Sequence, residues 1–450
     1  MVEMHVAGRQ QLRGEVKISG GKNAALALLA AALLPKGESV IADVPDVSDV
    51  RVMLRLLRSV GVKCSHQDGT VNVWANDLED VIPSPDLVDQ IRASIYLAGV
   101  FLARIGRVRI CLPGGCPLGR DVDFHLGAFT QMGAVVHHDQ ENHCIHAEVP
   151  RGRLQGVQIA LDPRWRSVGT TVNILLAASL AEGTTVISNA SADPDVVNCV
   201  QFLRAMGACV EGEGTETIVI EGVSELHGCE FSVVKDRVEA GTFMLAAAIT
   251  GGNVVLHGAP VSLMHSFMNK LRGTGIKMDV DGATIHLEAR GRARAVDITT
   301  RPYPGFPTDL QPPFGTLLSV ADGVGVITEA IHTHRMEYLH QLQKMGAQIV
   351  RNPGENGRLP GTAWVTGVDV LRGTTVEADD LRAGVALVLA GLAAEGETVV
   401  RNAEVIDRGY ASLESKFSEL GAIIHRHEAV EEARHADEGV RSSVVPQPSS

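Results

Sequence analysis

Several short stretches of the chain combine glycines with charged residues in ways that suit anion binding. The stretch ISGGKNAAL (residues 18–26) puts Lys22 and Asn23 after a glycine pair, at a predicted helix start. Such a turn exposes backbone N–H groups at the positive end of a helix, which favours a phosphate or carboxylate. An ordinary helix cap with a solvated lysine would show the same sequence, so the stretch alone does not decide between the two.

A second stretch of this kind is RWRSVGTT (residues 164–171). It places Arg166, Ser167, Val168 and Gly169 ahead of the apolar segment NILLAASL, which predicts a helix. Backbone N–H groups at the start of that helix could again hold an anion. The alternative is that Ser167 only caps the helix and that the arginines are solvated.

The loop LPGGCPLGR (residues 112–120) holds Cys116 close to Arg120. A nearby cation favours the thiolate and makes a cysteine reactive, whereas structural cysteines are usually buried in apolar elements. No histidine lies beside Cys116 to form a conventional nucleophile pair, so an incidental loop cysteine is the alternative.

Three further charged residues stand at predicted helix starts. Asp309 in GFPTDLQPPF could cap a helix or act as a general base that removes a hydroxyl proton. Arg382 in ADDLRAG and Arg408 in VIDRGY each open a predicted helix. Each of these residues alone is weak evidence, because surface arginines and capping acids are common.

These stretches occupy similar positions in a repeating unit. An Ala/Leu-rich helix, a glycine turn and a β-branched strand recur at intervals of about 70 residues. The turn glycines, which we expect to end the helices as C′ residues, are Gly37, Gly106, Gly183, Gly252, Gly323 and Gly396. A second series follows amphipathic helices and comprises Gly61, Gly133, Gly207, Gly275, Gly346 and Gly421. Alternating strands and helices predict an α/β protein.

The repeats also predict how the chain is divided. The last unit keeps its apolar helix (residues 387–394), which favours closed groups of units over an open solenoid. Two domains of three units are the natural partition of a 450-residue chain, with the break near residues 225–238. Facing domains would gather Lys22, Arg120, Arg382 and Arg408 around a small, multiply anionic ligand.

Composition excludes several classes of function. A net charge of −13 without a basic block argues against a nucleic-acid binder. The longest apolar run, residues 24–34, is too short to span a membrane. The odd count of 7 cysteines, at irregular spacing, predicts reduced thiols and a cytoplasmic location. The sequence contains no CxxC and no HExxH motif, so a metal site is not predicted.

Taken together, the motifs resemble those of the enolpyruvyl transferase family, and within it the UDP-N-acetylglucosamine 1-carboxyvinyltransferases of peptidoglycan synthesis. The resemblance runs from about Val6 to His425 and rests on SGGKNAAL, IRASIYLAG, LPGGC, SVGTT, FPTDLQ, DLRAG and IDRGY. It implies transfer of enolpyruvyl from phosphoenolpyruvate to the 3-hydroxyl of UDP-N-acetylglucosamine, with release of phosphate. It implies no metal, no organic cofactor and no obligate protein partner.

The same resemblance implies an inside-out α/β barrel with two domains of three βαβαββ-type units and an active site between them. The first domain is expected at residues 22–234, with a catalytic loop at 112–125. The second is expected at residues 1–21 and 235–427, so that it includes the N-terminal strand. Residues 428–450, which are polar and end in Pro/Ser, are expected to be disordered.

The resemblance also assigns roles to residues. Lys22 and Asn23 would contact phosphoenolpyruvate, and Arg382 and Arg408 would bind its carboxylate and phosphate. Asp309 would accept the sugar hydroxyl proton, and Cys116 would protonate the methylene carbon, giving a tetrahedral ketal that eliminates phosphate. The remaining expected substrate contacts are Arg92, Arg120, Asp121, Val122, Asp123, Phe124, Arg166, Ser167, Val168, Gly169 and Ile331. Because a thiolate opens an epoxide, Cys116 also predicts alkylation by fosfomycin.

The chain departs from the family pattern mainly on the nucleotide and phosphate side. The loop between Cys116 and Arg120 is one residue shorter, PRWR adds two residues, Val405 replaces a usual histidine, and DPD (residues 193–195) replaces E-P-E. These departures leave two alternatives open. One is a paralogue that enolpyruvylates another nucleotide, such as UMP, and the other is a non-catalytic paralogue that binds nucleotide sugars.

Overall fold

The computed structural model describes residues 2–76, 78, 82–112, 122–139, 141, 143–354 and 359–428. Of the tail expected to be disordered, residues 429–450 lie outside the described residues. Glu428 does not belong to that tail, because it is the last residue of strand β23 and pairs with Val2.

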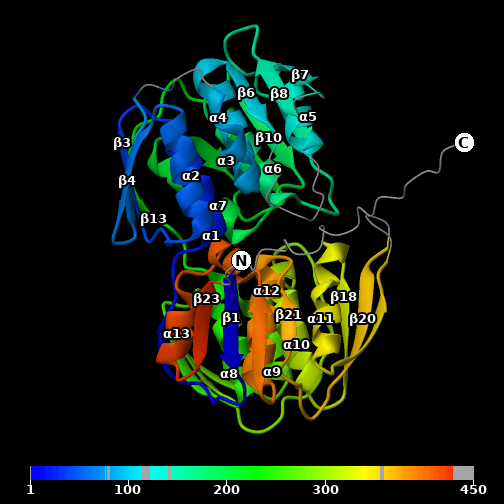
Figure 1. Cartoon of the computed structure of the whole chain (residues 1–450). Helices are drawn as coiled ribbons and strands as arrows, with labels where there is room; N and C mark the ends of the chain where they lie inside the picture. Colours follow the sequence, from blue (N-terminus) through cyan, green and yellow to red (C-terminus); the bar gives the residue numbers. More distant parts are fainter. Residues whose placement is uncertain are drawn as a thin grey trace, which may run out of the picture.

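The first three repeat units, apart from their first strand, form the half that is uppermost in Figure 1, here called the upper half. The first unit consists of β2 (Arg13–Lys17), α1 (Lys22–Ala31), β3 (Glu38–Ala42), α2 (Ser48–Ser59), β4 (Lys63–Gln67) and β5 (Thr70–Trp74). The second consists of α3 (Pro85–Gln90), η1 (Arg92–Ile95), α4 (Tyr96–Ile105), β6 (Arg107–Cys111), α5 (Asp123–Gln131), β7 (Val135–Asp139) and β8 (Cys144–Glu148). The third consists of β9 (Gln158–Ala160), α6 (Val168–Ala178), β10 (Thr184–Ser188), α7 (Pro194–Ala205), β11 (Cys209–Glu211) and β12 (Thr217–Glu221).

The last three units form the lower half, except that their first strand, β13, lies in the upper half and that β2 joins the lower half. The fourth consists of β13 (Glu230–Ser232), α8 (Arg237–Thr250), β14 (Asn253–His257), η2 (Val261–Leu263), α9 (His265–Gly273), β15 (Lys277–Asp281) and β16 (Thr284–Glu288). The fifth consists of β17 (Ile298–Thr299), η3 (Thr308–Leu310), α10 (Gln311–Val320), β18 (Val324–Glu329), η4 (Thr333–Met336), α11 (Tyr338–Lys344), β19 (Gln348–Asn352) and β20 (Gly361–Thr366). The sixth consists of β21 (Thr375–Glu377), α12 (Leu381–Ala393), β22 (Glu397–Arg401), η5 (Ala403–Arg408), α13 (Leu413–Glu419) and β23 (Ile424–Glu428), joined by β1 (Val2–Ala7) from the chain start.

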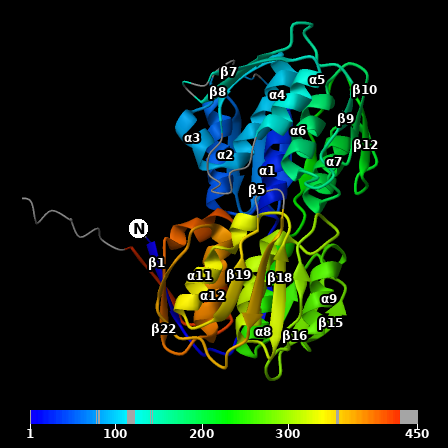
Figure 2. The same ribbon diagram turned by 90° about the vertical axis from the view of Figure 1, so that its right-hand side faces the viewer.

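Each half carries its helices inside and its sheets outside (Figures 1 and 2). The Ala/Leu-rich helices α1, α4 and α6 occupy the centre of the upper half, and α8, α10 and α12 occupy that of the lower half. They lack a polar face and are buried nearly all round, as α12 is from Arg382 to Leu392. The strands alternate between buried and exposed residues, because one face of each sheet covers these helices and the other meets solvent. The predicted α/β class and inside-out arrangement are thus confirmed.

The two glycine series behave differently. All members of the second series have positive φ, for example +84° at Gly61 and +91° at Gly421, just after an amphipathic helix. The expectation that the first series caps the apolar helices is wrong except at Gly106, the left-handed C-cap of α4. Helix α1, for example, ends at Ala31, and buried non-helical residues separate its end from Gly37. Helix α8 is capped by Gly251 in place of Gly252.

Two of the cysteines form a disulfide, so the prediction of reduced thiols is wrong for this pair. Strands β6 and β8 pair antiparallel with Cys111 opposite Cys144, and the structure joins the two sulfurs in a disulfide. Among the described residues, Cys64, Cys199, Cys209 and Cys229 are free. The spacing along the chain could not reveal this pair, because only the register of the two strands brings the side chains together.

The two halves exchange strands where the chain passes between them. Strand β2 pairs parallel with β14 of the lower half, and β13 pairs parallel with β3 of the upper half. The two connecting segments meet in a bridge between Gly20 and Lys235. The expected domain boundaries at 21/22 and 234/235 fall at these connections, and they stay a prediction.

Candidate active site

A cavity of about 680 Å³ lies between the two halves, with walls from both. It brings together most of the predicted site residues that the structure describes. Those that line it are Lys22, Asn23, Arg92, Phe124, Arg166, Ser167, Val168, Gly169, Asp309, Ile331, Arg382 and Arg408.

Two predicted contacts do not line this cavity. The side chain of Val122 is buried in the upper core, and Asp123 stands in the first turn of α5. Cys116, Arg120 and Asp121 lie outside the described residues. The prediction for this part of the loop therefore keeps only Phe124 in the cavity wall.

On the lower side of the cavity, Asp309 is bound by two arginines. Arg382 donates from Nη2 and Nε to the Oδ2 atom of Asp309, at 2.8 and 3.2 Å. Arg335 donates to the other carboxylate oxygen. Asp309 lies in the short helix η3, which runs directly into the buried helix α10, and its side chain lines the cavity. The carboxylate is thus held with both oxygens oriented, which is what a positioned proton acceptor requires.

Arg382 itself is buried and has a second set of partners. Its Nη1 atom lies 3.4 Å from the hydroxyl of Tyr410, which in turn bonds Thr242 at 2.8 Å. Burial alone would lower the pKa of Arg382, but Asp309, Tyr410 and Asp236 together outweigh that effect, and the pKa lies above its ordinary value. The guanidinium is therefore a fixed positive charge in the cavity wall.

Across the cavity, Lys22 and Arg408 share one carboxylate. Asp49, which is 4% exposed, accepts a hydrogen bond from Lys22 Nζ at 3.0 Å. Its Oδ1 atom also accepts from Arg408 Nε at 2.9 Å. Lys22 belongs to the upper half and Arg408 to the lower, so Asp49 holds cations from both halves at one point. Asp49 was not predicted from the sequence, because an aspartate in the first turn of a helix looks like an ordinary capping residue.

The ammonium group of Lys22 is perturbed by this environment. Burial lowers its pKa from the ordinary value, and the neighbouring Asp49 carboxylate opposes the change. The positive charges of Arg382 and Arg408 lower the pKa further, which shows how close the three cations lie. Such a cluster is costly to assemble unless an anion occupies it.

The start of helix α6 forms the wall of the upper half. Ser167 is the N-cap and its hydroxyl accepts from the Thr170 amide at 3.2 Å. Val168 and Gly169 follow and face the cavity. Arg166, at φ +39°, pairs with Glu216 at 2.7 Å. The helix start therefore has an ordinary serine cap, Arg166 is paired, and the binding of an anion by the backbone N–H groups stays a prediction.

A second acidic group lines the cavity beside Lys22. Arg237 donates to Asp193 at 2.6 Å, and Asp195 lies next to this pair. Burial raises the pKa of Asp195, and the Asp193 carboxylate raises it further. The shift follows from two carboxyl groups in one buried place, which do not ionise together easily.

The wall behind α6 is held by a neutral histidine. The Nδ1 atom of buried His125 lies 3.0 Å from the amide of Asn173, which also donates to the Ile95 carbonyl at 2.9 Å. Burial, with a smaller effect of Arg92, lowers the pKa of His125 to about 3. It is therefore uncharged and acts as a hydrogen-bonding support. His125, Arg335 and Arg237 were not predicted, and nothing in their local sequence singled them out.

Among the described residues, no group of three or more His, Cys, Asp or Glu side chains is placed to hold a metal ion. Within the same part of the chain, no helix is long and apolar enough to cross a membrane.

Comparison with known proteins fits this geometry. The family model described as EPSP synthase (3-phosphoshikimate 1-carboxyvinyltransferase) matches residues 6–417, and the chain belongs to this family of enolpyruvyl transferases. The crystal structure of the enolpyruvyl transferase NikO from Streptomyces tendae superposes with a TM-score of 0.86 at 25% identity, covering 95% of this chain and 99% of that one. The predicted enolpyruvyl transferase fold is confirmed.

Relatives of higher sequence identity point to one branch of this family. A protein of Symbiobacterium thermophilum is 45% identical over 94% of this chain and 94% of its own length. One of Caldanaerobacter subterraneus subsp. tengcongensis is 42% identical over 92% of this chain and 97% of its own length. Both are named UDP-N-acetylglucosamine 1-carboxyvinyltransferase 1, which agrees with the family that the sequence motifs indicated.

Proposed function

We propose that the chain transfers enolpyruvyl from phosphoenolpyruvate to the 3-hydroxyl of UDP-N-acetylglucosamine and releases phosphate, as a first step of peptidoglycan synthesis. The observation that carries the proposal is the meeting of Lys22, Arg382 and Arg408 opposite a helix start in one cavity that also contains Asp309. The names of relatives at 42% and 45% identity support the acceptor.

The three cations form the donor site of this proposal. Phosphoenolpyruvate carries a carboxylate and a phosphate, and an arginine fork fits either group. Arg382 and Arg408 bind these two groups, and Lys22 and Asn23 contact the same molecule from the upper half. Binding then neutralises a cluster of like charges, so the cavity favours a small, multiply charged anion over a neutral ligand.

The proton transfers fall to one residue on each side. Cys116 gives a proton to the methylene carbon of phosphoenolpyruvate, while the sugar oxygen bonds to the adjacent carbon and loses its proton to Asp309. The product of this addition is a tetrahedral ketal. In the elimination, the new methyl group returns a proton to the enzyme, the bond from carbon to phosphate oxygen breaks, and the double bond re-forms. The proton that Asp309 took from the sugar hydroxyl leaves with the released phosphate, and the proton from the methyl group restores Cys116, so the enzyme returns to its starting protonation state.

The nucleotide end is assigned to the wall of the upper half. Ser167, Val168, Gly169 and Arg166 hold the diphosphate at the start of α6. Arg120, Asp121 and Phe124 hold the uracil end, Ile331 contacts the nucleotide sugar, and Arg92 lines the cleft. Val122 and Asp123 are left out of this assignment, because they do not line the cavity. Small-molecule substrates alone are required. A cytoplasmic location belongs to the same proposal, because both substrates are multiply charged metabolites that membranes retain inside the cell.

Phosphate release tests the proposal directly. Purified protein is incubated with phosphoenolpyruvate and either UDP-N-acetylglucosamine or UMP, and phosphate is measured. We expect turnover with UDP-N-acetylglucosamine. Turnover with UMP alone would contradict the proposed acceptor, and binding without turnover on either would indicate a non-catalytic paralogue. The UMP alternative is not favoured, since the relatives at 42–45% identity are named for the nucleotide sugar.

Replacing Cys116 by aspartate is expected to keep part of the turnover and to abolish inactivation by fosfomycin. A carboxyl group can still carry the proton, but it is a much weaker nucleophile than a thiolate toward an epoxide. Residual activity after preincubation with fosfomycin measures the effect. Cys199→Ser, which removes a buried free thiol, is the control and should stay sensitive. A Cys116→Asp variant that is still inactivated would remove Cys116 from the active site.

The affinity for phosphoenolpyruvate is expected to decrease as the pH rises. The decrease should begin at a lower pH than it would if Lys22 had the pKa of an ordinary lysine. Lys22 binds the anion only while protonated, and its pKa is lowered by burial, so its charge is lost below the ordinary value of 10.5 as pH rises. The KM for phosphoenolpyruvate, measured from about pH 7 to about pH 10, should rise over this range. Lys22→Arg, which stays charged there, should lower activity yet flatten the profile. A rise that persists in the arginine variant would assign the ionisation to another group.

A further inference from the structure

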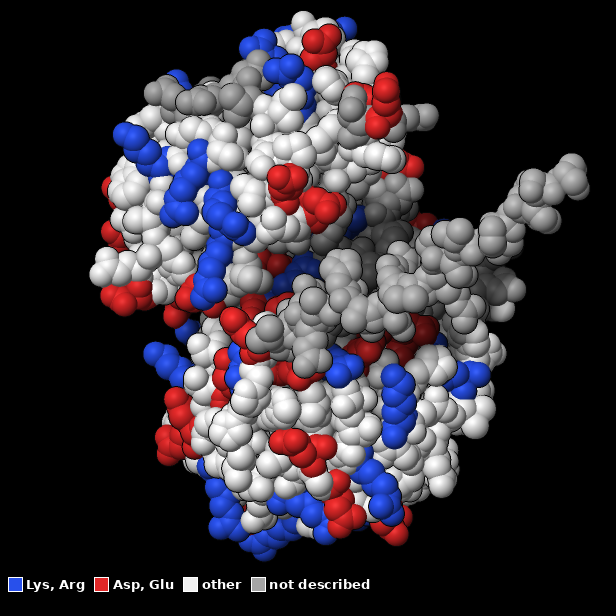
Figure 3. Space-filling view, viewed as in Figure 1, with Lys and Arg blue, Asp and Glu red and all other residues white. Residues whose placement is uncertain are grey.

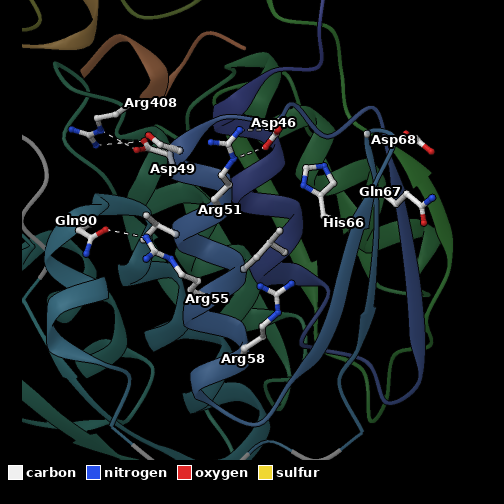
Figure 4. A pocket seen from close by; sticks show the side chains of 14 residues that line it. Asp46, Asp49, Arg51, Arg55, Arg58, His66, Gln67, Asp68, Gln90 and Arg408 are labelled. Carbon is white, nitrogen blue, oxygen red and sulfur yellow. Dashed lines mark hydrogen bonds and ion pairs between the residues drawn. The ribbon is translucent and has the colours of Figure 1, made fainter. Parts of the chain in front are cut away.

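A second cavity, of about 1000 Å³, lies on the surface of the upper half beside α2. Its walls come from α2, from the turn between β4 and β5, from Gln90 at the end of α3, and from η5 of the lower half (Figure 4). It is separate from the cleft, but Asp49 and Arg408 line both. We call this cavity the α2 groove.

Three arginines project from one face of α2 into the groove. Arg51, Arg55 and Arg58 are exposed and follow one another at spacings of four and three residues, which places them in a row along the helix. The opposite face of α2 is buried. Figure 3 shows basic side chains gathered on the upper half where Figure 1 places α2. The chain as a whole has a net charge of −13, so this row is a local reversal of charge.

The partners of these arginines differ. Arg51 is neutralised by Asp46, to which it donates from Nε and Nη2 at 2.7 and 2.8 Å. Arg55 donates to the amide oxygen of Gln90 at 3.3 Å, and Arg58 donates to the Cys64 carbonyl at 3.1 Å. Within the described part of the chain, the partners of Arg55 and Arg58 are therefore neutral groups.

The acidic residues that line the groove do not neutralise Arg55 and Arg58. Asp46 is engaged by Arg51, and Asp49 by Lys22 and Arg408. Asp68, in the turn after β4, is drawn in Figure 4 pointing away from the arginines. A plain solvated helix face is the simplest alternative, but such a face normally mixes acids with bases at these spacings because neighbouring like charges repel. A concave site with two guanidinium groups left without a carboxylate indicates an anionic ligand.

We propose that the α2 groove binds a small molecule with two or more phosphate groups, and that Arg55 and Arg58 are its main contacts. Guanidinium groups match phosphate oxygens with paired hydrogen bonds. Gln90 and His66 in the groove walls add neutral or weakly basic donors. A cavity of about 1000 Å³ is at the upper end of the range that proteins use for small ligands, so a molecule larger than a single phosphate fits.

The test uses inorganic pyrophosphate as the probe and isothermal titration calorimetry as the readout. The whole chain should show a groove site and, independently, anion binding in the cleft. The double variant Arg55→Ala/Arg58→Ala should weaken the groove site by about tenfold or more while the cleft site stays. Arg382→Ala should weaken anion binding in the cleft and leave the groove site unchanged. Arg55→Lys/Arg58→Lys, which keeps the charges but loses the forks, should bind with intermediate affinity.

A matched control separates the groove from general electrostatics. Helix α9 is the equivalent of α2 in the fourth unit, because each follows the apolar helix of its unit. Helix α9 carries the exposed residues Lys270 and Arg272. Lys270→Ala/Arg272→Ala removes the same charge from the lower half and should leave pyrophosphate binding unchanged. Equal weakening by both double variants, or no loss in Arg55→Ala/Arg58→Ala, would overturn the proposal.

Turnover with phosphoenolpyruvate and UDP-N-acetylglucosamine is measured on the same preparations. The groove variant should keep basal turnover, because neither arginine lines the cleft. This readout shows that the variant is folded. It also keeps the two proposals apart, since a lack of turnover in every preparation would contradict the proposed function without affecting the binding result.

Discussion

Replacing Asp309 by asparagine is expected to lower kcat by about 10²- to 10⁴-fold, the range for loss of a positioned general base. Asparagine has nearly the same shape, but it cannot accept the proton of the sugar hydroxyl. It also removes the negative charge that faces Arg382 and Arg335. Steady-state phosphate release with both substrates measures the effect, which should appear mainly in kcat.

Asp193→Asn is the matched control for that loss. It removes a carboxylate from the wall of the same cavity and from another arginine, Arg237, without touching the proposed proton acceptor. We expect a smaller decrease in kcat than for Asp309→Asn. If the two variants lose similar activity, or if Asp309→Asn keeps most of its turnover, another group accepts the proton.

Replacing Asp49 by asparagine is expected to destabilise the protein by about 3–5 kcal/mol, the usual cost of removing one partner from a buried ion pair. Asp49 is 4% exposed and faces both Lys22 and Arg408, so its loss leaves two cations facing one another. The free energy of unfolding in urea, followed by two spectroscopic probes, measures the change. The KM for phosphoenolpyruvate should rise as well, because both cations lose the group that positions them.

The control for this prediction lies one turn away. Asp46 also pairs with an arginine, but its side chain and that of Arg51 are each 60% exposed. Asp46→Asn should therefore change stability by about 0–1 kcal/mol, as exposed pairs do. Equal effects of the two substitutions would show that burial of the Asp49 cluster contributes nothing.

The repeats made most of the fold predictable from sequence. Apolar helices and amphipathic helices recur at a constant interval, and a recurring unit must pack against its copies to bury its faces. The second glycine series was placed correctly, because a residue with positive φ is needed where each amphipathic helix turns into a strand. The ends of the apolar helices were not placed correctly. Residues such as Leu33 and Leu34 lie beyond the end of helix α1 but are still buried and apolar, so the sequence pattern does not show where the helix ends.

The candidate site was predictable where its residues stand at the start of a helix, as Lys22, Ser167 and Arg382 do. Their partners were not. Asp49 is 27 residues from Lys22 and 359 from Arg408, and only the packing of the two halves brings them together. The same holds for Cys111 and Cys144, whose pairing depends on strand register. Local sequence identifies groups able to bind an anion, whereas the neighbours that set their charge and orientation come from tertiary structure.

The exchange of strands between the halves has a consequence for biosynthesis. Strand β3 of the upper half pairs with β13, and β1 pairs with β22 and β23, which are all made much later than their partners. The lower half therefore cannot complete its last sheet until synthesis has passed residue 428. Pairings over such long separations are slow to form. A nascent chain of this protein must therefore keep β1, which later lies between two other strands, unpaired and out of aggregates until β22 and β23 have been made.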